Sequence, residues 1–387
     1  YYDIISMSYL FLSCTEKIII HILSLISPTV SKFIQFKYTS RLAHQGHSDA
    51  QNDLGYMYMN GMGIAQNYEK AFEWFRKSAT QDNSLAQTNL GVMYQTGRGI
   101  TQNYEKALEW YNKAAMQGDS DAQTNLGVMY QSGQGVTQNY EKALEWYNKS
   151  AMQEDSDAQN NLGWMYQNGE GVVQNYQKAF EWYSKAAAQN NSFAQTNLAL
   201  MYQNGQGVTQ NYKKAFKLVS KAATQELLTA QCSMGWMYQH GYGVTQSYKK
   251  AFNCYNRAAI QGDANAQNNL GTMYIIGQGI AQNDKKAFEW FSKAAAQEHA
   301  AAQDNLGIMY YKGLCVSQSY EKAFEWFSKA AAQDEANAQN NLGVMYENGH
   351  GVIQNQEKAI EWFGKAAAQG SVDAKNNLAE MAEKGSI

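Results

Sequence analysis

One residue position recurs along this chain without a slip. An alanine stands every 36 residues, ten times in succession. These residues are Ala50, Ala86, Ala122, Ala158, Ala194, Ala230, Ala266, Ala302, Ala338 and Ala374. Self-similarity at a period of about 20–50 residues is typical of stacked repeat arrays, in which each unit buries its apolar side only against its neighbours. The period therefore predicts one elongated array in place of several globular domains.

Each unit has the pattern of a helical hairpin. After Ala122, apolar residues follow the spacing of an amphipathic helix. We expect Gly133 to end this helix in the left-handed conformation, and Asn139 to cap a second helix that starts at Tyr140. Gly127 lies inside the first helix, where glycine costs about 0.5–1 kcal/mol relative to alanine. Its recurrence in most units indicates that a neighbouring helix needs the space.

The sequence thus predicts an all-α fold, an α-solenoid of nine 36-residue helical hairpins with a partial unit at each end. The units start at residues 50, 86, 122, 158, 194, 230, 266, 302 and 338, and a half unit covers 374–387. We assign residues 41–387 to the array. Residues 1–40 are apolar, and three interpretations stay open for them: an end-cap, a targeting segment or a damaged repeat. Their apolar runs are shorter than the roughly 18 residues that a membrane span needs.

Composition excludes several classes of function. The formal net charge of −3 gives no overall attraction to nucleic acid, and any membrane contact is expected only through residues 1–30. The four cysteines do not follow the period, so they form no disulfide framework, and a reducing, cytoplasmic compartment is favoured. A secreted or membrane-associated location follows instead if residues 1–30 are a targeting segment. No phosphate loop, catalytic triad or metal-ligand cluster is visible, so we predict neither an enzyme nor a cofactor.

The exposed face of the first helices is the candidate partner-binding groove. Helical geometry places the residues two, three, six and nine after each opening alanine on that face. The third is nearly always Asn and the ninth mostly Gln, and such amides can donate to and accept from the main chain of a peptide. The alternative is that these amides cap or bridge neighbouring helices.

The sixth residue after the alanine varies between units, as a specificity position would. Trp164 and Trp236 flank Leu200 in this series, with His240 nearby, and large aromatic side chains dominate binding hot spots. Packing of both tryptophans against the next unit is the alternative. The candidate groove residues are Asn89, Asn125, Asn161, Trp164, Gln167, Asn197, Leu200, Gln203, Trp236, Gln239, His240, Asn269, Asn305 and Asn341.

The outer face of the second helices carries a local change of charge. Lys213, Lys249 and Lys285 stand where the other units mostly have Glu. In two of these units Leu218 and Cys254 also replace a tryptophan that recurs elsewhere, and we expect that tryptophan to belong to the core. A solvated surface and a site for an acidic protein partner are both open.

The pattern resembles the Sel1-like repeat family, relatives of the tetratricopeptide repeats. In outline it reads A-x-x-x-L-G-x-M-Y-x-x-G-x-G-V-x-x-N-Y-x-K-A-x-E-W-Y-x-K-A-A, as in Ala122–Ala151, and it covers Ala50–Gly385. Proline is absent from the turns, and Gln-Asn replaces the usual Lys-Asp before the second helix. The resemblance implies a right-handed superhelix that scaffolds protein complexes.

The leading functional hypothesis is a non-enzymatic scaffold or adaptor that binds a protein or peptide along the concave face formed by the first helices. The alternative is a β-lactamase-like or peptidoglycan-fragment-binding repeat protein. Ser247 with Lys250 and Ser319 with Lys322 match the S-x-x-K signature of β-lactamases. Other units hold Asn in the same place, so we interpret these serines as helix caps.

Overall fold

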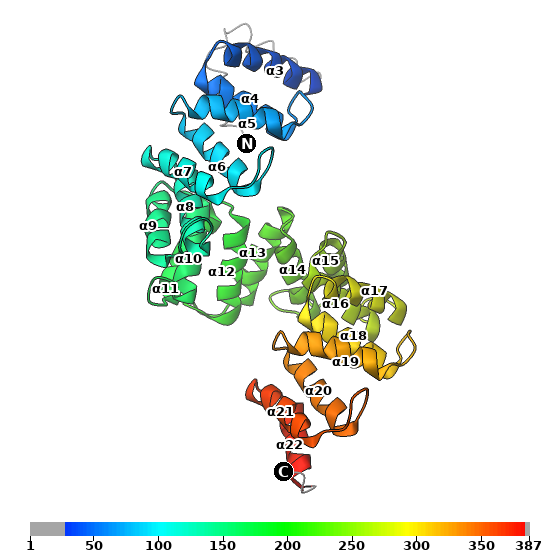
Figure 1. Cartoon of the computed structure of the whole chain (residues 1–387). Helices are drawn as coiled ribbons and strands as arrows, with labels where there is room; N and C mark the ends of the chain where they lie inside the picture. Colours follow the sequence, from blue (N-terminus) through cyan, green and yellow to red (C-terminus); the bar gives the residue numbers. More distant parts are fainter. Residues whose placement is uncertain (1–27, 384–387) are drawn as a thin grey trace. The chain divides into compact units, whose positions relative to one another are not determined.

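The computed structural model of the chain describes residues 28–383, which form twenty α-helices and no β-strand (Figure 1). The first helices of the hairpins are α4 (Ser48–Asn60), α6 (Ser84–Thr96), α8 (Ser120–Ser132), α10 (Ser156–Asn168), α12 (Ser192–Asn204), α14 (Leu228–His240), α16 (Ala264–Ile276), α18 (Ala300–Lys312), α20 (Ala336–Asn348) and α22 (Val372–Glu383). The second helices are α5 (Tyr68–Ala79), α7 (Tyr104–Met116), α9 (Tyr140–Ala151), α11 (Tyr176–Ala188), α13 (Tyr212–Thr224), α15 (Tyr248–Ile260), α17 (Asp284–Ala295), α19 (Tyr320–Ala331) and α21 (Gln356–Ala368). The remaining helix, α3 (Pro28–His44), precedes the first full hairpin.

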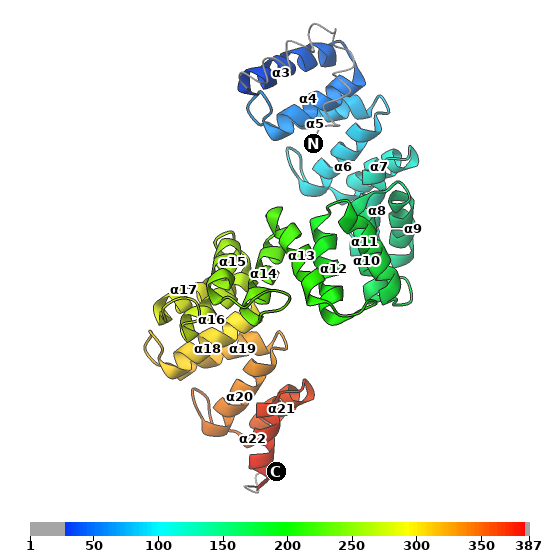
Figure 2. The ribbon, with the colours of Figure 1, turned by 180° about the vertical axis from the view of Figure 1, so that it is seen from behind.

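Two compact units divide the chain, Tyr1–Ala194 and Gln195–Ile387. Within each unit the extensive contacts join helices that are consecutive in the chain, such as α8 with α9 and α16 with α17. Figure 2 shows the same succession of helices from behind. Each unit is therefore a stack of hairpins in which a hairpin packs on its neighbours, and the predicted all-α repeat solenoid is confirmed.

The start of the array lies inside α3. Leu42 and Ala43 of α3 are buried with Ala50 and Leu54 of α4, so the helix supplies the half unit before the first full hairpin. Residues 1–27 lie outside the described residues, and the three interpretations of the apolar start of the chain stay predictions. None of the helices within residues 28–383 combines the length and apolar character that a bilayer crossing requires.

Helix ends fall where the capping residues predict. Gly133 ends α8 with a φ of 72°, and Asn139 Oδ1 accepts a hydrogen bond of 2.8 Å from the backbone N–H of Lys142 in α9. Ser247 and Ser319 cap α15 and α19 in the same way. Their hydroxyls thus have a structural partner, as interpreted from the sequence.

The glycine inside each first helix lies against an aromatic ring of the second helix. A Cβ atom built on Gly127 would stand 2.4 Å from the Tyr147 ring, which is closer than atoms can pack. The same contact is made in each of the eight units with this glycine, and the ring there is Tyr or Phe. In the one remaining full unit, which begins at Ala194, Ala199 replaces the glycine and Val219 replaces the ring. The expected close approach is confirmed, and the size of both partners changes together.

A second turn glycine makes contact between neighbouring hairpins. A Cβ atom on Gly135, whose φ is 69°, would stand 2.6 Å from Cβ of Tyr104 in the preceding hairpin. Cys315 takes this position once, with a φ of 56°. The residue opposite it is then Asp284 in place of tyrosine, and Cys315 Sγ lies 3.5 Å from the Asp284 carbonyl oxygen. The backbone at this position is therefore left-handed whether the residue is Gly or Cys.

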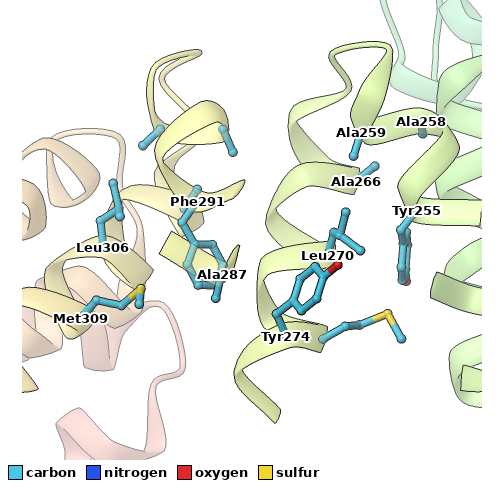
Figure 3. Packing of buried hydrophobic residues seen from close by; sticks show 14 of the residues in the cluster. Tyr255, Ala258, Ala259, Ala266, Leu270, Tyr274, Ala287, Phe291, Leu306 and Met309 are labelled. Atoms are coloured by element: carbon cyan, nitrogen blue, oxygen red, sulfur yellow. The ribbon is translucent and has the colours of Figure 1, made fainter. Parts of the chain in front are cut away.

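The core is a row of small clusters, each shared by consecutive helices. In the cluster drawn in Figure 3, Phe291 of α17 lies with Leu306 and Met309 of α18. Fully buried alanines such as Ala266 let the helix backbones come close. The recurring tryptophans of the second helices pack at the edges of these clusters, for example Trp146 against the cluster of α7 and α8. Apolar burial is therefore spread evenly along each unit.

A buried glutamine ties each hairpin to the one before it. The residue after the opening alanine is Gln in all nine full units and is buried. Gln123 Nε2 donates to the carbonyl oxygen of Ala115 in the preceding hairpin at 3.2 Å, and its Oε1 accepts from Gln153 Nε2 at 2.9 Å. Gln231 departs from this scheme, because neither of its side-chain polar atoms has a hydrogen-bond partner among the described residues. Corresponding bonds in other units, such as Gln51 to Ala43 and Gln267 to Ala259 at 3.1 Å, hold consecutive hairpins in register.

The contact between glycine and ring is tested by adding one methyl group. Gly127→Ala is expected to lower the free energy of unfolding by about 1–3 kcal/mol, because the crowding outweighs the gain in helix propensity. Gly364→Ala is the control, since nothing lies within 4 Å of its Cβ position, and it is expected to stabilise the helix. The double variant Gly127→Ala with Tyr147→Val reproduces the natural pair Ala199 and Val219. Its loss in free energy of unfolding should be smaller than the sum of the losses of the two single variants. Strict additivity in denaturant unfolding would contradict this interpretation.

Candidate functional site

The recurring asparagine of the first helices bridges neighbouring hairpins. Its side-chain NH₂ group donates to the residue that stands two positions after the opening alanine of the preceding hairpin. The distance from the asparagine Nδ2 to the acceptor Oδ1 lies between 2.8 and 3.0 Å in four pairs, which are Asn89 with Asn52, Asn305 with Asn268, Asn341 with Asp304, and Asn377 with Asn340. Asn269 makes the corresponding contact of 3.7 Å to Cys232 Sγ. The bridging alternative is therefore observed for these amides, and Asn125, Asn161 and Asn197 occupy the equivalent half-buried position.

The recurring glutamine at the ninth position accepts a hydrogen bond from a tyrosine. Tyr147 Oη donates to Gln131 Oε1 at 2.7 Å, and Tyr183 Oη donates to Gln167 Oε1 at 2.9 Å. Four units pair Tyr with Gln in this way, namely Tyr111 with Gln95, Tyr147 with Gln131, Tyr183 with Gln167 and Tyr255 with Gln239. The four units with Phe in the ring position carry other residues there, which are Met59, Ile275, Tyr311 and Glu347. Gln203 differs from all of these, because Val219 opposite it has no hydroxyl group.

A hollow opens beside Trp236 in the unit Gln195–Ile387. It has a volume of about 290 Å³. It is lined by Leu200, Gln203, Thr229, Cys232, Ser233, Trp236, Asp263, Asn265 and Asn269. Leu200 is 39% exposed, so apolar surface faces solvent here. The structure thus brings together four of the predicted groove residues, from α12, α14 and α16.

His240 stands next to this hollow without lining it. Its ring centroid lies 4.6 Å from that of Trp236, and its Nδ1 lies 2.9 Å from the Trp236 carbonyl oxygen. Tyr242 packs in the same group of rings, with its centroid 5.0 Å from Trp236, 5.7 Å from His240 and 4.6 Å from Tyr212. These rings support Trp236, a role that the sequence did not indicate for His240, which was predicted as a groove residue. Trp164 is 37% exposed and belongs to the unit Tyr1–Ala194, so the structure does not join it to the hollow.

The sequence did not single out Thr229, Cys232, Asp263 and Asn265 for this site. They precede or follow an opening alanine by one to three residues and reach the hollow only because neighbouring first helices lie side by side. The usable signal was the departure from the repeat pattern in this unit, where Cys232 and Ser233 replace the usual polar pair. Asp263 also caps α16, since its Oδ1 accepts from the Ala266 backbone N–H at 2.7 Å.

The thiols near this site are inert at neutral pH. Burial raises the pKa of Cys232 to about 12 and that of Cys254 to about 11, so both stay protonated. No group of three or more His, Cys, Asp or Glu side chains suited to a metal ion occurs within residues 28–383. The hollow combines the apolar side chains of Leu200 and Trp236 with the side-chain amides of Gln203, Asn265 and Asn269.

A smaller hollow of about 180 Å³ lies further along the same unit. It joins Ile308 and Val344, the sixth-position residues of two neighbouring hairpins, with Asn341 and Tyr311. Tyr311 Oη lies 2.8 Å from His350 Nδ1, and His350 stacks on Tyr320 at 4.4 Å between ring centroids. The variable sixth position thus lines both hollows, and its role as a specificity position stays a prediction.

The stacked hairpins place the protein among the α-solenoids built from two-helix repeats. The model of the Sel1 repeat matches nine consecutive segments, each 36 residues long, at 48–83, 84–119, 120–155, 156–191, 192–227, 228–263, 264–299, 300–335 and 336–371. The chain belongs to the Sel1 repeat family, as its sequence pattern indicated. Members of this family are generally non-enzymatic scaffolds for protein interactions.

Two solved structures show the same architecture. The first is c5321, a protective antigen of uropathogenic Escherichia coli with an SLR fold, which is 38% identical over 91% of this chain and 75% of its own, with a TM-score of 0.66. The second is a Sel1 repeat protein from Oxalobacter formigenes, 30% identical over 63% of this chain and 96% of its own, with a TM-score of 0.56. The comparison with curated protein sequences gives no match.

Asp304 makes the stability of the fold depend on pH. Burial raises the pKa of this carboxyl to about 6, against the hydrogen bond from Asn341 that lowers it, and Glu335 raises it further. A raised folded-state pKa means that the charged form destabilises the fold above pH 6, and that the penalty fades as the pH falls toward the unfolded-state value.

Asp304→Asn is therefore expected to stabilise the protein at pH 7 by about 1–3 kcal/mol and to have little effect near pH 4. Asn268 and Asn340 accept the same inter-hairpin hydrogen bond, so the fold accommodates the change. Thermal melts of both proteins across this pH range measure the difference. An equal gain at both ends of the range would refute the titration of Asp304 as its cause.

Proposed function

We propose that this protein is an adaptor that binds an extended segment of a partner protein against its first helices, with the hollow beside Trp236 as the principal contact. The observation that carries this proposal is the hollow itself, which combines the exposed side chain of Leu200 and the half-buried side chain of Trp236 with the amides of Gln203 and Asn269. An aromatic side chain in a hollow edged by polar groups has the composition of a binding hot spot.

The amides divide into two groups under this proposal. Asn89, Asn305 and Asn341 donate to the preceding hairpin, while Gln167 and Gln239 accept from tyrosines, so these five mainly align the helices. We propose that Asn125, Asn161 and Asn197 contact the bound segment at further points along the same face. Gln203 has no tyrosine opposite it, so its amide is the one best suited to contact the main chain of a bound segment.

The neighbouring rings give Trp236 a fixed orientation. Contacts with His240 and Tyr242 restrict the indole, which lowers the entropy lost when a partner binds. Gln267 and Asn269 of α16 bond to Ala259 and Cys232, so this side of the surface is formed before binding. Both features favour a recognition surface for a peptide.

The test uses peptides selected from a displayed library against the full chain. Trp236→Val is expected to weaken the selected peptides by about tenfold or more, because it removes the aromatic side chain from the hollow. The fold should tolerate this change, since Val92, Val128 and Val344 hold the same position in other hairpins.

Met152→Ala is the matched control, because Met152 is an apolar side chain that is 85% exposed at the end of a second helix. It should leave peptide affinity unchanged, and circular dichroism should show both variants as helical as the parent. Selected peptides that bind the Trp236→Val variant as tightly as the parent would rule out the hollow as the principal contact.

A further inference from the structure

Two neighbouring second helices carry only positive charge. The helix α13 has four lysines and α15 has two lysines and an arginine, and neither helix has a carboxylate. Each of the other seven second helices from α5 to α21 has at least one Asp or Glu. We define the basic strip as the exposed residues Lys213, Lys217, Lys221, Lys249, Arg257 and Lys285. Within α13 and α15 these residues are spaced by four or eight positions, so they lie on one face of each helix and point outward together.

This charge is placed where helix electrostatics oppose it. Lys213, Lys249 and Lys285 lie in the first turn of their helices, where the helix dipole favours acidic residues and where Glu69 stands in the first full unit. Lys217 stands four residues before Lys221, and like charges at this spacing repel. An ordinary unit has an attractive pair at these two positions, as in Glu109 with Lys113 at 2.8 Å. The strip thus lowers local stability, which points to a use on the surface.

The same two helices have also lost their outer aromatic ring. In seven hairpins a lysine lies over the ring of the tryptophan at this face, as Lys113 does over Trp110 at 4.2 Å. Leu218 and Cys254 take the place of that tryptophan in α13 and α15. Two independent features of the repeat therefore change together in the hairpins that hold most of the strip.

We propose that the basic strip binds an acidic segment of a partner protein, on a surface separate from the hollow on the first helices. The strip is short, because Glu289 on α17 and then Glu321 and Glu325 on α19 follow it in the same unit. A nucleic acid carries its phosphates without interruption and would run onto these carboxylates. The loss of the two tryptophans also removes the outer rings of this face on which bases could stack. A short run of Glu or Asp side chains matches both the charge and the extent of the strip.

The test measures binding of a short labelled polyglutamate peptide to the full chain, with polyglutamine of the same length as the uncharged probe. The parent protein should bind polyglutamate, progressively less as salt is added, and should not bind polyglutamine. Lys213→Glu combined with Lys249→Glu should weaken polyglutamate binding by about tenfold or more. Both changes install the residue that Glu105 and Glu141 represent in other hairpins, so this variant should melt no lower than the parent.

The matched control is Arg98→Glu combined with Lys312→Glu, which changes the net charge equally at two exposed positions outside the strip. It should retain nearly all binding of polyglutamate. A milder double variant is Lys213→Gln with Lys249→Gln, since Gln177 stands at the equivalent position of another hairpin. It should lose an intermediate share of the polyglutamate affinity. Equal losses in the strip variant and the control, or no binding of polyglutamate by the parent, would overturn the proposal. Tighter, strip-dependent binding of a single-stranded oligonucleotide or of phosphatidylserine vesicles would overturn it in favour of a phosphate-bearing partner.

Discussion

The structure depends on the packing of one aromatic ring against one helical glycine, which occurs inside eight of the nine full hairpins. This contact lets the two helices of a hairpin approach closely, and it sets the geometry from which the next hairpin continues. Glycine inside a helix lowers helix propensity, and the chain accepts that loss in eight units. The pair Ala199 and Val219 shows that the summed size of both partners is what the fold requires.

Polar groups then define how hairpins follow one another. The buried glutamines and the half-buried asparagines connect each hairpin to the preceding one, so specificity of stacking comes from amides while affinity comes from apolar burial. The hairpin that begins at Ala230 departs from this scheme in several places, with Gln231 unpartnered and with Cys232 and Ser233 at the bridging positions. The larger hollow and most of the basic strip lie in this hairpin and its neighbours. The part of the array that deviates from the repeat is thus the part with the most distinctive surface.

Much of the fold followed from sequence because its determinants are local. Capping residues such as Asn139 and Gly133 act within a few positions, and a fixed period repeats the same solution along the chain. The role of the amides did not follow, because a helical projection shows which side chains share a face but not which neighbour they reach. Asn341 needs Asp304 of another hairpin as its acceptor, and the hollow needs residues that precede the next helix. Contacts between hairpins require the stacking geometry that only the structure supplies.

The central claim is that every hairpin is a complete structural unit that depends only on its neighbours. Deletion of residues 122–157 removes one whole period and joins Asp121 to Ala158, so Asp119 can cap a helix that begins at Ser120, because the register of the array is kept. Circular dichroism and denaturant unfolding of this shortened protein are the most direct measurement. The account predicts unchanged helicity per residue and cooperative unfolding with a smaller denaturant dependence, in proportion to the surface removed. Loss of helicity or of cooperative unfolding throughout the shortened chain would contradict it.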